Sequence, residues 1–524
     1  MVISRRIRSA ASNPLISYML PTIGNMIFIS LLAVLVFGSG NGLLGDGDSG
    51  SHIRTGEVIL DNRSIPSHDI YSYHTPALEW TAHEWLAEII MAAIHRAFGL
   101  TGVVLFFAVL LAVIHWLLFR VLRSQSNDII LCALITLLAT ATSSSHWLVR
   151  PHVFSLALTL IWYHLLNRFQ YRDQQTLFYL PVLMLLWVNL HGGFIIGLVL
   201  LGIYLLGNIF HAIFGPPTES TVSQAKAKLI FLCIIATVLV TLLNPVGYKI
   251  LLFPFRVTSD RFLMDRVAEF LSPNFHEVLP FKYMLLATMA ALALARSSLN
   301  VIEVGLLTLL SYMALYSVRH VSLFAIIAAP ILLRTGENIV NQLSARWLQF
   351  YRQRNTNLNA IEAKLNGHLW PCVAFLLIAG LCLTGNLRYN FNDKVFPVAA
   401  VDFLQREKIS GNMFNNDEFG DYMIFAAWPK YRVFMDGRSD MYGEKYGNPY
   451  LKAAHAFPGW KDVLAQFSID WVIFDTESAL AAALSEQSDW QPIYSDKIAT
   501  VFVRKNAMNE LLLAKYPAVK LGFQ

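Results

Sequence analysis

The N-terminal stretch from residue 16 to residue 52 decides the fold, and it reads ISYMLPTIGNMIFISLLAVLVFGSGNGLLGDGDSGSH. Its first part, from about Ile16 to Phe37, is an apolar run of the roughly 17–25 residues that an α-helix needs to cross a hydrocarbon core. A cluster of arginines precedes the run, but it is longer than the apolar region of a secretory signal peptide and no Ala-x-Ala-like cleavage site follows it. We therefore predict a retained first transmembrane helix.

Apolar runs of the same kind recur along the first three quarters of the 524-residue chain. Hydrophobic residues make up 55% and charged residues only 14%, whereas a typical soluble domain has about 45–50% and about 25%. This composition excludes a soluble protein, and the modest net charge of +5 gives no reason to expect nucleic acid as a partner. We predict a polytopic α-helical membrane protein with about eleven transmembrane helices. They are placed near residues 16–38, 100–121, 128–144, 152–168, 176–191, 193–213, 228–245, 282–296, 300–317, 320–334 and 367–385.

The placement of Lys and Arg predicts the orientation. These residues gather in alternate loops, which are the ones expected in the cytoplasm together with the N-terminus. An odd number of spans puts residues 386–524 on the opposite side. We therefore expect a membrane domain at 1–385, with a long first external loop at 38–99, and a soluble periplasmic domain at 386–524. The pattern is typical of a multi-pass protein of the bacterial inner (cytoplasmic) membrane.

The C-terminal region has mixed polar and aromatic character. Short apolar runs at 433–435, 471–474 and 497–504 indicate buried strands, and 402–408 and 461–467 read as helical turns. A small α/β module is predicted.

The first external loop is the richest in polar chemistry. Asp46 and Asp48 follow the first span directly, and two carboxylates at this spacing can accept a proton or hold a divalent cation such as Mg²⁺ or Mn²⁺. The other interpretation of a single Asp-x-Asp is a solvated turn. Further along, His52 and His83 are candidates for binding substrate, and Glu84 provides another carboxylate. Residues 82–98 have apolar side chains at helical spacing, which predicts an amphipathic helix on the membrane surface.

The order of these motifs resembles the GT-C superfamily of integral-membrane glycosyltransferases in bacteria. The resemblance lies in Asp46-Gly-Asp48, His52 with the following Gly-Glu, an Ile-Pro-x-x-Asp-x-Tyr-Ser stretch at 65–72, and His83-Glu84-Trp-Leu. It implies transfer of a sugar from a polyprenyl-phosphate or diphosphate donor, with an acidic residue of the first external loop central to catalysis. Asp48 or Asp46 matches that role, and Glu84 supplies another carboxylate.

Polar residues at the external ends of other predicted spans point to the same face. Ionisable residues at membrane depth are costly and usually face a cavity or the bundle interior. A guanidinium suits a phosphate, and an imidazole can donate a hydrogen bond or carry a proton. The candidates for binding donor and acceptor are Arg150, His152, His191, Arg319 and His320. The charged loop after the seventh predicted span is either a salt-bridged surface helix or a mobile lid.

In the C-terminal domain, Asp436 and Arg438 follow the predicted strand at 433–435. They can contact sugar hydroxyls or the acceptor, since loops at strand ends commonly display binding residues. An internal pair that holds the turn explains them equally well.

The function predicted from these features is an inverting membrane glycosyltransferase with a lipid, glycan or protein acceptor on the periplasmic face. A polymerase or ligase of lipid-linked glycans shares the same external site and stays an alternative. A lipid or glycan transporter is another, but no charged pair lies near the middle of a predicted span and no inverted repeat of broken helices is visible. A third alternative is a structural scaffold that presents the C-terminal domain, but it does not explain why the first loop is so rich in Asp, His and Glu.

Overall fold

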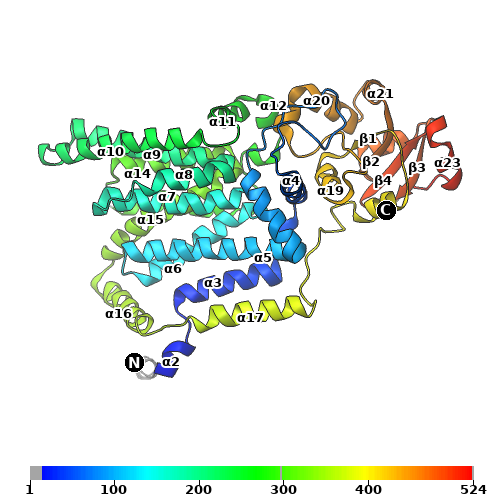
Figure 1. The fold of residues 1–524 in the computed structure, drawn as a ribbon. Helices are drawn as coiled ribbons and strands as arrows, with labels where there is room; N and C mark the ends of the chain where they lie inside the picture. Colours follow the sequence, from blue (N-terminus) through cyan, green and yellow to red (C-terminus); the bar gives the residue numbers. More distant parts are fainter. Residues whose placement is uncertain (1–13, 296–297, 522–524) are drawn as a thin grey trace.

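The computed structural model describes residues 14–295 and 298–521. It consists of a long helical bundle with a small domain of mixed helices and strands at one end (Figure 1). The arginines at the N-terminus and Arg296, on which the predicted orientation partly rests, lie outside the described residues.

A helix lies at each of the predicted span positions. Six described helices are long and apolar enough to cross a membrane by length and composition, so the chain is a multi-pass membrane protein; the count of eleven stays a prediction. The bundle helices are α3 (Ile23–Ala33), which η1 (Val34–Gly38) continues, α5 (Trp85–Gln125), α6 (Ile129–Ser143), α7 (His152–Arg172), α8 (Tyr179–Leu190), α9 (Ile195–Phe214), α10 (Pro217–Thr241), α13 (Pro280–Leu294), α14 (Val301–Tyr316), α15 (Val321–Asn341) and α17 (Leu369–Leu383).

The polar segments between these helices fall at the two ends of the bundle. At the end away from the C-terminal domain lie α2 (Pro14–Met19) and α16 (Ala345–Glu362), and α11 (Lys249–Ser259) and α12 (Arg261–Met264) lie near that domain (Figure 1). The remaining short helical segments are η2 (Gly42–Leu44), η3 (Ser144–His146), η4 (Gly192–Phe194), η5 (Ala268–Phe270) and η6 (Val318–His320).

The first external segment contains a helix where a loop was predicted. Helix α4 (Asp48–Asn62) packs against the first part of α5 and against α19 (Asp417–Ala427) of the C-terminal domain. The predicted amphipathic helix is also present, beginning at Trp85, and it continues through a kink at Gly99 into the second predicted span. Gly99 has a φ of +64°, a conformation that favours glycine. The external segment is therefore a folded layer between the bundle and the C-terminal domain.

The C-terminal domain is built on a four-stranded sheet. Its strands are β1 (Asn412–Asn415), β2 (Ile469–Asp475), β3 (Trp490–Ser495) and β4 (Ala499–Arg504), in the order β1-β2-β4-β3. The pair β1 and β2 is parallel and the other two pairs are antiparallel. Besides α19, its helices are α18 (Val398–Arg406), α20 (Ser439–Ala454), α21 (Trp460–Gln466), α22 (Ala479–Ser485), η7 (Ala507–Asn509) and α23 (Glu510–Lys515).

Most of the elements predicted for this domain are confirmed. The strands at 471–474 and 497–504 correspond to β2 and β4, and the two helical turns correspond to α18 and α21. The strand predicted at 433–435 is wrong. Its three apolar side chains are buried in the domain, but only Val433 forms a bridge, and it pairs with Ser72 of the first external segment. The run is apolar because it is buried between layers and not because it belongs to the sheet.

Candidate functional site

Asp46 and Asp48 lie at the beginning of α4, just after the first predicted span. The backbone N–H of Asp48 donates to Oδ1 of Asp46 at 2.9 Å, and Asp48 is the first residue of the helix. Carboxylates are stabilised at a helix N-terminus by its unpaired N–H groups and by the helix dipole. Burial, and then the neighbouring Asp48, raises the pKa of Asp46 above its ordinary value. The start of α4 thus holds two acidic side chains at one point.

Arg150, between η3 and α7, joins these two carboxylates. Its Nη1 is 2.8 Å from Oδ2 of Asp46, and its Nη2 is 2.7 Å from Oδ2 of Asp48. Nη1 also pairs with Oε1 of Glu269. Only 14% of the Arg150 side chain is exposed. Three acidic side chains from two separate parts of the chain therefore meet on one guanidinium.

Glu269, in η5, was not among the residues predicted from the sequence. Its Oε2 lies 3.8 Å from Nε of Arg319, whose guanidinium stands 5.4 Å from the centre of the Phe270 ring. Its carbonyl oxygen accepts a hydrogen bond from the hydroxyl of Ser317 at 2.8 Å, which ties η5 to η6. Burial would raise the pKa of Glu269, but Arg150 and then Arg319 outweigh it and lower that pKa to about 2. The charged loop thus places an ionised carboxylate beside both arginines.

Glu84 forms a second cluster with three histidines. Its Oε1 is 3.3 Å from Nε2 of His191 and 3.5 Å from Nε2 of His83, and its Oε2 is 3.4 Å from Nε2 of His52. His52 lies one helical turn after Asp48 on α4 and also contacts Glu88 through Nδ1 at 3.1 Å. His191, after α8, is oriented by Ser155 on α7, with 2.7 Å between Nδ1 and Oγ. Three segments thus direct imidazole nitrogens at one buried carboxylate.

The pKa shifts of His83, Glu84 and His191 indicate which side chains of this cluster are charged. Burial would lower the pKa of His83, but Glu84 outweighs it and raises that pKa to about 9. Burial would raise the pKa of Glu84, but His83 and the other histidines hold it well below its ordinary value. Burial lowers the pKa of His191 to about 3. Near neutral pH, Glu84 is therefore an anion paired with a protonated His83, and His191 is a neutral imidazole that can donate or accept one hydrogen bond.

The remaining predicted histidines lie at the edge of the two clusters. His152, the first residue of α7, bonds through Nε2 to the carbonyl oxygen of His146 at 2.9 Å. His320 follows Arg319 in η6. Neither histidine is joined to the carboxylates by an ion pair within the described part of the chain. Their role in binding substrate stays a prediction.

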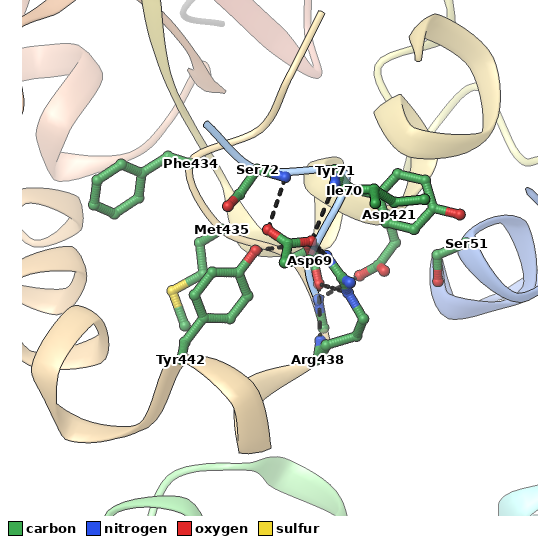
Figure 2. Close-up of polar contacts among 12 residues, drawn as sticks. Ser51, Asp69, Ile70, Tyr71, Ser72, Asp421, Phe434, Met435, Arg438 and Tyr442 are labelled. Atoms are coloured by element: carbon green, nitrogen blue, oxygen red, sulfur yellow. Dashed lines mark hydrogen bonds and ion pairs between the residues drawn. The ribbon is translucent and has the colours of Figure 1, made fainter. Parts of the chain in front are cut away.

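Asp436 and Arg438 form an internal pair, which is one of the two interpretations that the sequence allowed. Nη2 of Arg438 is 2.7 Å from Oδ2 of Asp436 and 2.8 Å from Oδ1 of Asp69. Figure 2 shows Arg438 beside Asp69. Asp436 is fully buried. Trp80 is also buried, with the guanidinium of Arg438 4.6 Å from the centre of its ring. The pair holds the C-terminal domain on the first external segment.

The turn between these two residues brings the C-terminal domain against Asp48. A Cβ atom at Gly437 would lie 2.2 Å from Oδ1 of Asp48 and 2.7 Å from Oδ2 of Asp421. The N–H of Gly437 donates to that oxygen of Asp421 at 2.7 Å, and the other oxygen, Oδ1, is buried and has no hydrogen-bond partner among the described residues. Burial, and then Asp48, raises the pKa of Asp421 well above its ordinary value. The site is therefore closed on one side by a carboxylic acid of the C-terminal domain.

The arrangement does not fit the divalent cation that Asp46 and Asp48 suggested. The Oδ2 atoms of both residues already face the nitrogens of Arg150. Within residues 14–295 and 298–521, no three His, Cys, Asp or Glu side chains are grouped so that they could hold a metal ion. The positive charge of the site is supplied by arginine.

No protein-family model and no curated protein sequence matches the chain. Two solved structures of the oligosaccharyltransferase of Archaeoglobus fulgidus do resemble it. The apo form has a TM-score of 0.52 at 13% identity, over 92% of this chain and 74% of that one. The AglB complex with an inhibitory peptide and a dolichol-phosphate has a TM-score of 0.55 at 12% identity, over 86% and 69%. The chain therefore has the fold of these oligosaccharyltransferase structures.

Proposed function

We propose that the chain is an integral-membrane glycosyltransferase that moves a sugar from a polyprenyl-phosphate or diphosphate donor to an acceptor on the non-cytoplasmic face. The observation that carries the proposal is the meeting of Asp46, Asp48, Arg150, Glu269 and Arg319 at the end of the bundle that faces the C-terminal domain. In this proposal residues 1–385 form the membrane domain and residues 386–524 the external domain.

The chemistry assigns a role to each part of the site. The acceptor hydroxyl oxygen forms a bond to the anomeric carbon while the bond from that carbon to the phosphate oxygen breaks, and the electron pair leaves with the phosphate. Asp48 takes the hydroxyl proton as general base. Arg319 is 28% exposed, and among the described residues its one ion pair is that of 3.8 Å with Glu269, so its guanidinium is available to the leaving phosphate. Displacement from the opposite side inverts the anomeric centre.

The Glu84 cluster binds the donor in the same scheme. His191 is a neutral imidazole at the buried end of the cluster, and the protonated His83 is a cation beside it. Both can donate to phosphate or sugar oxygens. Glu84 is paired with several histidines, so it orients them and is not itself a free base.

The likeness to AglB supports a donor of this class, because that protein was solved with a dolichol-phosphate, which is a polyprenyl phosphate. It also favours a second candidate within the same chemistry. AglB is an oligosaccharyltransferase, so the second candidate is transfer of a preassembled glycan rather than one sugar, with a peptide as acceptor. The mass of the product distinguishes the two.

The test uses the full-length chain in proteoliposomes with polyprenyl-phosphate sugars that carry a radiolabel in the sugar. Host membrane extract supplies the acceptors. The label is expected to leave the lipid fraction and to appear in a lipid, glycan or protein product. Accumulation of unchanged substrate inside sealed vesicles without any lipid-linked donor would instead establish a transporter.

Replacing Gly437 by alanine is expected to lower sugar transfer about a hundredfold, because the new Cβ displaces the carboxylate of Asp48 and a shift of about 1 Å can cost that much. The rate is measured in the same proteoliposomes. The matched control is Gly42→Ala, because a Cβ at Gly42 would meet no atom within 4 Å and its rate should equal that of the wild type. Equal rates for the two variants would show that the turn does not position Asp48.

A further inference from the structure

Arg150 has the position that a bound cation would have among acidic ligands. It faces Asp46, Asp48 and Glu269, which come from the start of α4 and from η5. Its Nη2 pairs with Asp48, and its Nη1 pairs with Asp46 and Glu269. All four side chains are at most 27% exposed. A permanent positive charge therefore lies where the carboxylates converge.

The backbone holds Arg150 in this position. The N–H of Val149 donates to the carbonyl oxygen of Leu43 at 2.9 Å, and both residues are buried. Leu43 belongs to η2, which leads directly into Asp46. The segment that carries the guanidinium is thus bonded to the segment that carries its first partner. This bond orients Arg150 before any substrate arrives.

A divalent cation would compete with the guanidinium for the same oxygen atoms. Mg²⁺ and Mn²⁺ bind carboxylate oxygens, and a cation that took those of Asp46 and Asp48 would have to push Arg150 aside. The displaced arginine keeps its charge, since it does not lose its proton in proteins. Two like charges would then face each other in a largely buried site, where their repulsion is strong.

We propose that Arg150 takes the place of a divalent cation in this site, so that the carboxylate cluster is closed to Mg²⁺ and Mn²⁺ and sugar transfer proceeds without them. The claim that transfer proceeds without these cations rests on the proposed function. The claim that the carboxylate cluster is closed to Mg²⁺ and Mn²⁺ does not. Arg150 compensates the acidic residues, and Arg319 stays available to the phosphate of the donor.

The test is Mn²⁺ binding to the purified full-length chain, measured by electron paramagnetic resonance after treatment with EDTA. The wild type is expected to bind no stoichiometric Mn²⁺, and EDTA is expected to leave its transfer rate unchanged. Arg150→Ala removes the charge and leaves the carboxylates, so it should bind Mn²⁺ about tenfold or more tightly than the wild type. Arg150→Lys keeps a cation and should exclude Mn²⁺ as the wild type does.

The outcomes separate this inference from the proposed function. One Mn²⁺ per wild-type chain that is lost in Asp46→Asn would overturn the inference, and so would a folded Arg150→Ala variant that gains no Mn²⁺. If Arg150→Ala does not fold, the wild-type and Arg150→Lys measurements decide. Transfer by the wild type that requires Mg²⁺ or Mn²⁺ overturns the inference and leaves the function standing. The expected Mn²⁺ results without transfer from any donor support the inference and count against the function.

Discussion

Replacing Asp48 by asparagine is expected to reduce sugar transfer by a factor of about a hundred to ten thousand, the usual contribution of a positioned general base. The amide has nearly the shape of the carboxylate and can still accept a hydrogen bond from Arg150, which lies 2.7 Å away. It cannot take the proton of the acceptor hydroxyl. The loss should therefore appear in the rate of transfer measured in proteoliposomes, with the variant expressed and folded as the wild type.

The matched control is Asp61→Asn, which makes the same change on the same helix. Asp61 lies near the end of α4 and pairs with Arg96 at 2.7 Å, with both side chains well exposed. An exposed pair of this kind contributes little to stability, and Asp61 is not part of the carboxylate cluster. Its variant should transfer sugar at the wild-type rate. Full transfer by Asp48→Asn would remove Asp48 from the mechanism and would leave the assignment of the site without its base.

The positions of the bundle helices were predictable because the membrane imposes a simple rule. Backbone groups in hydrocarbon must bond within their own segment, so a long apolar run is a helix whatever it packs against. The run from Ile16 to Phe37 and the apolar runs after it are long enough to predict their helices from the sequence alone. Helix α4 could not be predicted in this way, because Gly50 and Gly56 weaken its helical propensity. A Cβ at Gly56 would lie 1.9 Å from the carbonyl oxygen of Glu88, so this glycine is explained only by the neighbouring helix.

The candidate site was also predictable only in part, because some of its residues are brought together by contacts between distant segments. Asp46, Asp48 and Glu84 belong to a local motif that can be read along the chain. Glu269 belongs to a loop with several other charged residues, and no local feature distinguishes it from them. Its role follows from its pairing with Arg150, which is 119 residues away in the sequence. Contacts at this separation are a property of the packed molecule.

The largest expected effect on stability is that of Arg438→Met. Arg438 lies between Asp69 and Asp436, which are buried, and its guanidinium also stands 4.9 Å from the centre of the Tyr71 ring. Figure 2 shows Arg438 with Asp69 and Tyr71. Methionine fills much of the same space but leaves both carboxylates without their cation. Removing one partner from a buried ion pair costs about 3–5 kcal/mol, because the remaining charge has no compensation. The melting temperature in detergent should fall accordingly.

The loss of stability in Arg438→Met is expected at the junction between the first external segment and the C-terminal domain. The N–H of Val433 donates to the carbonyl oxygen of Tyr71 at 3.1 Å, and His74 bonds through Nε2 to the carbonyl oxygen of Phe434 at 2.7 Å. Asp69 accepts hydrogen bonds from the N–H groups of Tyr71 and Ser72 and so holds this junction from one side. Limited proteolysis of Arg438→Met should therefore release the C-terminal domain earlier than in the wild type.

Two further variants test whether the uncompensated charge is the cause. Arg96→Met breaks the exposed pair with Asp61, and such pairs contribute about 0–1 kcal/mol, so its melting temperature should stay close to that of the wild type. In the double variant Asp69→Asn, Arg438→Met, one of the two orphaned charges is gone, so part of the lost stability should return. A double variant no more stable than Arg438→Met would mean that the uncompensated charge of Asp69 is not the cause of the loss, and that packing of the arginine against Tyr71 and Trp80 holds the two layers together.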